Sequence, residues 1–91
     1  MMNPEAAQVL ALDALRFLAE DGERLGRFLA LSGMGPQDLK TSAGNPAFLG
    51  GVLDHLLSDE SLLFLFAESQ GIDADIPAKA RRALPGAPVE Q

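Results

Sequence analysis

The single histidine of the chain, His55, stands among acidic residues in the stretch LDHLLSDES. Asp54 precedes it, and Asp59 and Glu60 follow it shortly afterwards. Imidazole and carboxylate groups are ligands of metal sites and partners in general acid-base catalysis. Because the chain has no cysteine, carboxylates alone would have to complete a metal site around His55. His55 also lies at the edge of an apolar helical stripe, so we expect a residue at the boundary of the core, and neither a metal nor a cofactor.

Nucleophilic chemistry has equally weak support in the sequence. The serines fall at predicted helix ends, caps and polar faces, and none lies in a G-x-S-x-G motif. Gly33 and Gly35 in GMGPQD resemble the start of a dinucleotide-binding fingerprint, but they follow a helical pattern rather than a strand and lack the third glycine. We therefore predict no catalytic residue and no enzymatic activity.

Residues 27–40, RFLALSGMGPQDLK, carry the pattern of a helix-turn-helix. A helical segment stops at Gly33, a short turn follows, and Leu29 and Leu39 occupy the internal positions where such motifs pack apolar side chains. Four polar side chains would then face a DNA groove: Gln37, Lys40, Thr41 and Ser42.

Charge argues against this DNA-binding hypothesis. The net charge of the chain is −6, whereas binding to phosphates needs a basic face. Asp38 would lie on the recognition helix itself, and the stretch AGNP at residues 43–46 stops that helix early. The one basic cluster, KARR at residues 79–82, is explained by cations that complement a helix dipole at its C-terminal end. A corner between two helices used only for packing is the simpler interpretation of residues 27–40.

Length and composition indicate one small domain that depends on packing alone. The 91 residues suffice for a single domain, and without cysteine no disulfide is available. The absence of cysteine is compatible with a reducing compartment. The first 17 residues lack the positively charged start of a signal peptide, and the longest apolar run is far shorter than the roughly 20 residues of a membrane span. We therefore predict a cytoplasmic protein that does not enter the membrane.

Proline residues and capping side chains mark the helix starts. Pro4, Pro36, Pro46 and Pro77 each stand where proline is tolerated as a first helical residue, and Asp21 and Ser58 are further candidate caps. Valine and isoleucine are too few to predict strands. We expect an all-α bundle of five to six helices, over residues 4–20, 22–32, 36–42, 46–57, 59–70 and 77–84. Residues 1–84 would form the domain, residues 85–91 a flexible tail, and the two short helices would close the ends of the core.

The fifth predicted helix contains more apolar residues than one face can hold. Six apolar residues run from Leu62 to Ala67. At about 100° per residue, four of them form a normal core stripe, and Phe64 and Leu65 fall outside it. Leu31 is a similar outlier on the second helix. Either these residues are buried because neighbours surround the helix on several sides, or they form an exposed apolar patch that binds a partner protein or a second copy of the chain.

The stretches ALRFLAEDGERLGRFLALSGM, residues 14–34, and LGGVLDHLLSDESLLFLFA, residues 49–67, resemble a domain-of-unknown-function family of short, acidic, all-helical proteins from alphaproteobacteria. The resemblance covers about residues 5–84. In that family a proline commonly occupies the position of Gly22, where this chain departs from the pattern. The resemblance implies a compact cytoplasmic helical domain, and it implies no activity and no site residue.

These observations favour a non-catalytic protein-interaction or adaptor module, with Phe64, Leu65 and Leu31 as candidate partner-binding residues. The alternative is a DNA-binding regulator that uses residues 27–40.

Overall fold

The computed structural model describes residues 2–86 and confirms the all-α prediction. Six helices follow one another along the chain, and the described residues contain no strand. They are α1 (Pro4–Ala19), α2 (Gly22–Ser32), α3 (Asp38–Ser42), α4 (Pro46–Leu57), α5 (Glu60–Gln70) and α6 (Ile76–Arg82). Of the predicted tail, Pro85 and Gly86 are described, and residues 87–91 lie outside the described residues.

Three helices begin directly after a side chain that caps them, and of these three caps Asp21 is the one that the sequence predicts. The side chains of Asn3, Asp21 and Asn45 each accept a hydrogen bond from a backbone amide in the first turn of the following helix, at 2.7 to 2.9 Å. These bonds satisfy amides that have no partner within the helix. Gly33 and Gly71 end α2 and α5 in the left-handed conformation, with φ of 74° and 66°. A side chain would be strained there.

Two predicted helix starts are wrong. The cap of α5 is Asp59 rather than Ser58, because Asp59 adopts the extended conformation and its carboxylate accepts the Leu62 amide at 3.2 Å. Ser58 instead continues the α4 backbone and donates its hydroxyl hydrogen to the His55 carbonyl at 2.7 Å. The third helix begins at Asp38, because Pro36 lies in the preceding turn.

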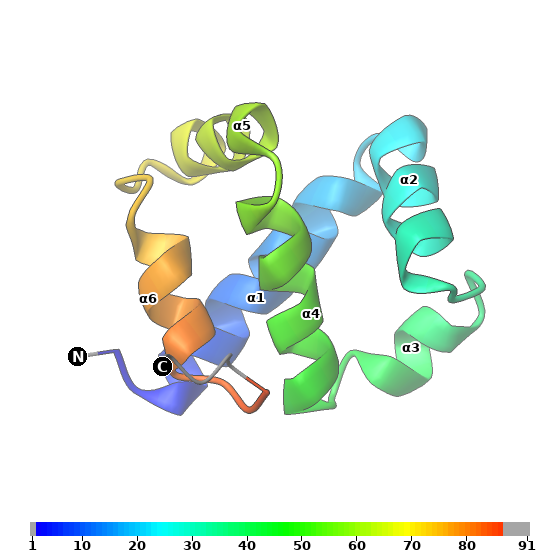
Figure 1. The fold of residues 1–91 in the computed structure, drawn as a ribbon, viewed down its shortest axis with the longest axis horizontal. Helices are drawn as coiled ribbons and strands as arrows, with labels where there is room; N and C mark the ends of the chain where they lie inside the picture. Colours follow the sequence, from blue (N-terminus) through cyan, green and yellow to red (C-terminus); the bar gives the residue numbers. More distant parts are fainter. Residues whose placement is uncertain (1, 87–91) are drawn as a thin grey trace.

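The core lies where α1, α4 and α6 pack against one another (Figure 1). α4 crosses in front of α1 in this view, α6 lies on one side of the pair, and α2 and α3 lie on the other. Every third or fourth residue of α1 is fully buried, at Ala7, Ala11 and Ala14. Alanine has a small side chain that lets neighbouring helices approach closely. α1 contacts α2, α4 and α6, so it packs on more than one side.

The sixth helix belongs to the core rather than to its end. The sequence indicates a short closing element, but α6 packs on both α1 and α4 and buries Pro77, Ala80 and Arg81. α2, in contrast, buries only Phe28 and lies at the periphery. The apolar stripe of α4 is confirmed, with Leu49, Val52, Leu53 and Leu56 almost fully buried.

Candidate functional site

Phe64 and Leu65 lie on the solvent side of α5. Their exposed fractions are 54% and 48%, whereas Leu62, Phe66 and Ala67 of the same helix are buried. The helix therefore has one core face, as its stripe indicates, and a second apolar face in water. Of the two interpretations that the sequence leaves open, the structure supports exposure over burial by several neighbours.

Leu31 lies in the last turn of α2 and is 70% exposed. It lines a hollow of about 290 Å³ together with Glu60 and Ser61 from the first turn of α5. A second hollow of about 270 Å³ shares Leu31, His55 and Ser58 with the first and extends between α2 and α4. The two hollows thus form one shallow groove that begins between α2 and α4 and reaches the start of α5.

Phe64 and Leu65 lie on α5 beyond the residues that line the groove. Phe64 follows Glu60 by four positions, and Leu65 follows Ser61 by four positions, so each pair lies on one face of α5 about 6 Å apart. Leu31 borders the same groove from α2. We call the region formed by the groove, which Leu31 lines, and by Phe64 and Leu65 one helical turn beyond it the α2/α5 surface.

Charged groups surround the α2/α5 surface unevenly. Glu60 and Glu68 are exposed and lie one turn before and one turn after Phe64. Asp59 and Arg27 both line the groove. Carboxylates therefore outnumber cations among the residues that line the groove beside α5 or flank Phe64.

His55 is half-buried in the wall of the groove. Its ring packs edge-on against the Phe28 ring, with a centroid distance of 5.1 Å. Partial burial and the nearby Arg27 guanidinium lower the pKa of His55 below 6.5, and the Asp59 carboxylate opposes this shift only in part. The imidazole is therefore neutral at pH 7 and lies at the margin of the core.

The acidic neighbours of His55 in the sequence have other roles. Asp54 binds Arg81, and Asp59 caps α5. Within residues 2–86, no three acidic or histidine side chains gather closely enough to hold a metal ion.

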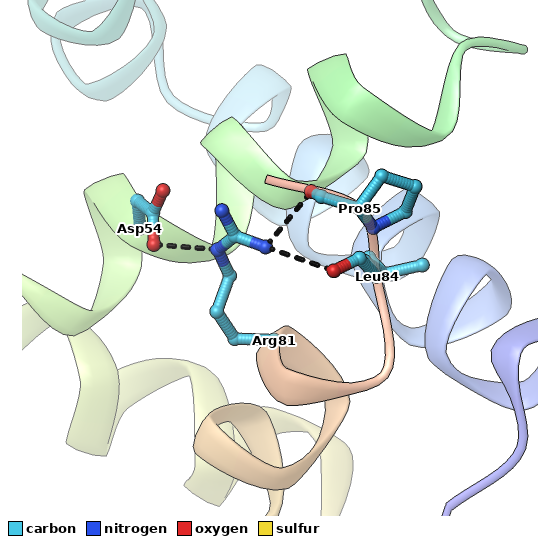
Figure 2. Close-up of polar contacts among 4 residues, drawn as sticks. All are labelled: Asp54, Arg81, Leu84 and Pro85. Atoms are coloured by element: carbon cyan, nitrogen blue, oxygen red, sulfur yellow. Dashed lines mark hydrogen bonds and ion pairs between the residues drawn. The ribbon is translucent and has the colours of Figure 1, made fainter. Parts of the chain in front are cut away.

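Arg81 is a polar side chain whose burial is not predicted from the sequence. Its side chain is 8% exposed, and its Nε donates to the Asp54 carboxylate at 2.7 Å. Its Nη1 donates to the carbonyl oxygens of Leu84 and Pro85 at 3.4 and 3.1 Å (Figure 2). The cluster KARR thus contains one buried cation, Arg81, that joins α6, α4 and the segment after α6. A signal was available, because Arg81 shares a helical face with Pro77, Ala80 and Leu84.

The residues of the DNA-binding hypothesis lie on a short element. α3 has five residues, so Gln37 precedes it and only Lys40, Thr41 and Ser42 lie on it. The Asp38 carboxylate accepts the Gly35 amide at 3.0 Å and stabilises the turn. Leu29 and Leu39 pack against the core as such a corner requires. None of these contacts favours DNA binding over simple packing.

Two further surface features are not predicted from the sequence. Val9 of α1 is 59% exposed, although it lies in an apolar stretch. A hollow of about 490 Å³ lies between the start of α1 and α6, and its lining includes Met2, Lys79 and Arg82. The Lys79 ammonium group already pairs with the Asp75 carboxylate at 3.4 Å.

These features define a small all-helical domain with an exposed apolar surface and an acidic border. The chain belongs to the family described as "Protein of unknown function (DUF3572)", which matches residues 4–87. This match confirms the resemblance to a domain-of-unknown-function family, and an alphaproteobacterial origin stays a prediction. No curated protein and no solved structure is significantly similar to the chain. None of the helices in the described part of the chain is long and apolar enough to cross a membrane.

Proposed function

We propose that this chain is a cytoplasmic, non-catalytic protein-interaction module that binds its partner through the α2/α5 surface. The observation that carries the proposal is the exposure of Phe64 and Leu65 on a helix whose core face is formed by Leu62, Phe66 and Ala67. The lack of cysteine is compatible with the reducing cytoplasm.

Exposed aromatic and aliphatic side chains in one region are typical of interaction sites, whereas scattered ones are ordinary. Leu31 lines the groove together with the first turn of α5, and the exposed Phe64 and Leu65 follow one turn later on the same helix. Phe64 is well suited to be an anchor, because aromatic side chains dominate the binding energy of many interfaces.

The test is affinity capture from a lysate of the native bacterium, with wild type and a Phe64→Ser, Leu65→Ser double variant run in parallel. We expect one protein to be captured by wild type and lost with the variant. Val9→Ser is the matched control, because it removes an equally exposed apolar side chain from α1. Capture that is equal with wild type and the double variant contradicts the proposal.

The double variant must be folded for this comparison to be valid. Because both side chains are about half exposed, we expect its free energy of unfolding to change by less than about 1 kcal/mol. Chemical denaturation followed by far-ultraviolet circular dichroism measures this value. A loss of several kcal/mol, as for truncation of a buried aromatic, would show that Phe64 belongs to the core.

A further inference from the structure

We propose that the partner segment bound by the α2/α5 surface is a basic amphipathic helix of another protein. This inference rests on the proposed function and names the chemistry of its partner.

The shape of the surface fits a helix. The groove runs between α2 and α4 and continues to α5, with Leu31 on one side and Phe64 and Leu65 beyond its end. An amphipathic helix would place its apolar side chains against Leu31, Phe64 and Leu65 and its polar side chains over the groove, whose lining beside α5 is mostly polar. The 11 residues of α5 span about 16 Å, so a partner helix of about the same length can contact the whole surface.

The charges around the surface select a basic partner. Glu60 and Glu68 flank Phe64, and Asp59 lines the groove, whereas Arg27 is the cation on the opposite wall. His55, which also faces the groove, is neutral at pH 7. Lysine or arginine side chains beside the apolar stripe of the partner would therefore meet an excess of carboxylates. Such complementarity raises the association rate and discriminates against acidic partners.

The same charges disfavour a second copy of the chain as the occupant. In a two-fold dimer with antiparallel α5 helices that meet at Phe64, Glu60 of one chain faces Glu68 of the other. Like charges in contact oppose that arrangement. A symmetric dimer thus places carboxylate against carboxylate. A basic helix in the same position instead places lysine or arginine side chains against these carboxylates.

The experiment is a selection from a displayed library of 16-residue helices with fixed leucines on one face. The positions beside the leucines vary equally among Lys, Glu and Gln. The library is selected on the full chain and depleted on the Phe64→Ser, Leu65→Ser variant. We expect the surviving peptides to be enriched in Lys, and their affinity to be at least about tenfold weaker for the double variant.

Two charge variants separate local from general attraction. Glu60→Gln, Glu68→Gln removes one carboxylate from the first turn and one from the last turn of α5. Glu5→Gln, Glu20→Gln removes one from the first turn of α1 and one from its C-cap, with the same change in net charge. We expect the first variant to weaken the Lys-rich peptides about three- to tenfold and the second to leave them unchanged.

Each other outcome overturns the inference in a distinct way. Peptides that need Phe64 and Leu65 but show no Lys enrichment, or no response to Glu60→Gln, Glu68→Gln, overturn the basic partner and leave the interaction function standing. If both charge variants weaken peptide binding equally, the peptides are attracted by the net negative charge of the protein and not by the carboxylates of α5. If no peptide distinguishes wild type from the double variant, the surface does not bind helices. The proposed function is then decided by lysate capture alone.

Discussion

Arg81 shows how one side chain can join its own helix to a distant helix and to the segment that follows it. Its guanidinium is buried, but the Asp54 carboxylate that it binds is half exposed. Water therefore solvates the carboxylate far more than the guanidinium. The carbonyl oxygens of Leu84 and Pro85, which follow α6, accept hydrogen bonds from its Nη1. Removing the counterion of such a buried cation destabilises the fold, because the free energy needed to take the cation out of water is then no longer offset.

We therefore expect Asp54→Ala to lower the free energy of unfolding by about 1–3 kcal/mol. Asp13→Ala is the matched control, because Asp13 also pairs with an arginine on a helix, at 3.5 Å, but with Arg16 almost fully in water. Its cost should stay below about 1 kcal/mol, as for other surface ion pairs. Urea denaturation of the two variants gives both values, and equal effects would show that burial of Arg81 does not strengthen the bond.

His55 makes the stability of the protein depend on pH. Because the pKa of His55 is lower in the folded state than the ordinary 6.5 of the unfolded chain, the unfolded state binds the proton first as the pH falls. The free energy of unfolding should therefore decrease as the pH falls from about 7 through 6.5 toward the lower folded pKa, and it should be unaffected by His55 above this range.

Replacing His55 by Gln should flatten this part of the curve, because Gln does not titrate. Melting temperatures measured at half-unit steps from pH 8 to pH 5 for both proteins check the prediction. Carboxylates titrate similarly in both, so the difference between the two curves isolates His55. A variant curve as steep as that of wild type would assign the pH dependence to other groups.

At the scale of the helices, two adjacent glycines of α4 have opposite surroundings. A Cβ atom at Gly50 would lie 2.8 Å from Arg81 Nη1 and 3.1 Å from the Pro85 carbonyl oxygen. At Gly51 no atom other than those of the helix lies within 4 Å. The first glycine is therefore required by packing, whereas the second weakens the helix without a packing reason.

We expect Gly50→Ala to destabilise the fold by about 1–3 kcal/mol through overpacking against the buried arginine. Gly51→Ala should instead stabilise it by about 0.5–1 kcal/mol, because alanine is the better helix former. Thermal unfolding of wild type and of the two single variants measures both effects within the same helix. If both variants are more stable than wild type, the Arg81 side chain moves aside easily. Its bonds to Asp54, Leu84 and Pro85 would then contribute less to stability than we infer.

The helices differ in how much of them the sequence predicts. Asn3, Asp21 and Asn45 cap helices because each is the only capping side chain at its boundary. At Ser58 and Asp59 two candidates stand side by side, and the backbone conformation that α4 imposes on Ser58 decides between them. Such a tertiary constraint leaves no local signal.

The role of α6 escaped prediction for a different reason. Pro77, Ala80, Arg81 and Leu84 recur at helical spacing, but the charge of Arg81 hides this core face, because arginine is rarely buried unless it is paired. The outliers Phe64, Leu65 and Leu31 could be named from helical periodicity, but their exposure depends on which neighbours pack against α5 and α2. The groove itself joins three helices, so no periodicity within one helix predicts it.

At the scale of the whole molecule, net charge and the size of the α2/α5 surface together bear on self-association. Three partly exposed apolar side chains amount to at most a few hundred Å², whereas a stable interface buries about 800 Å² on each partner. The net charge of −6 adds repulsion between copies, and salt above about 0.1 M screens it. Apolar contact alone is therefore too small to hold two copies together against this repulsion.

We accordingly expect a monomer at pH 7 and low salt, with weak association that increases as salt is added. The Phe64→Ser, Leu65→Ser variant should remain monomeric throughout, because it retains the repulsion and lacks the apolar contact. Sedimentation velocity of both proteins from about 0.02 to 0.5 M salt separates these effects, since screening acts on charge and not on apolar contact. A wild-type dimer that is already tight at low salt would contradict this expectation and make a second copy, rather than a basic helix, the occupant of the surface.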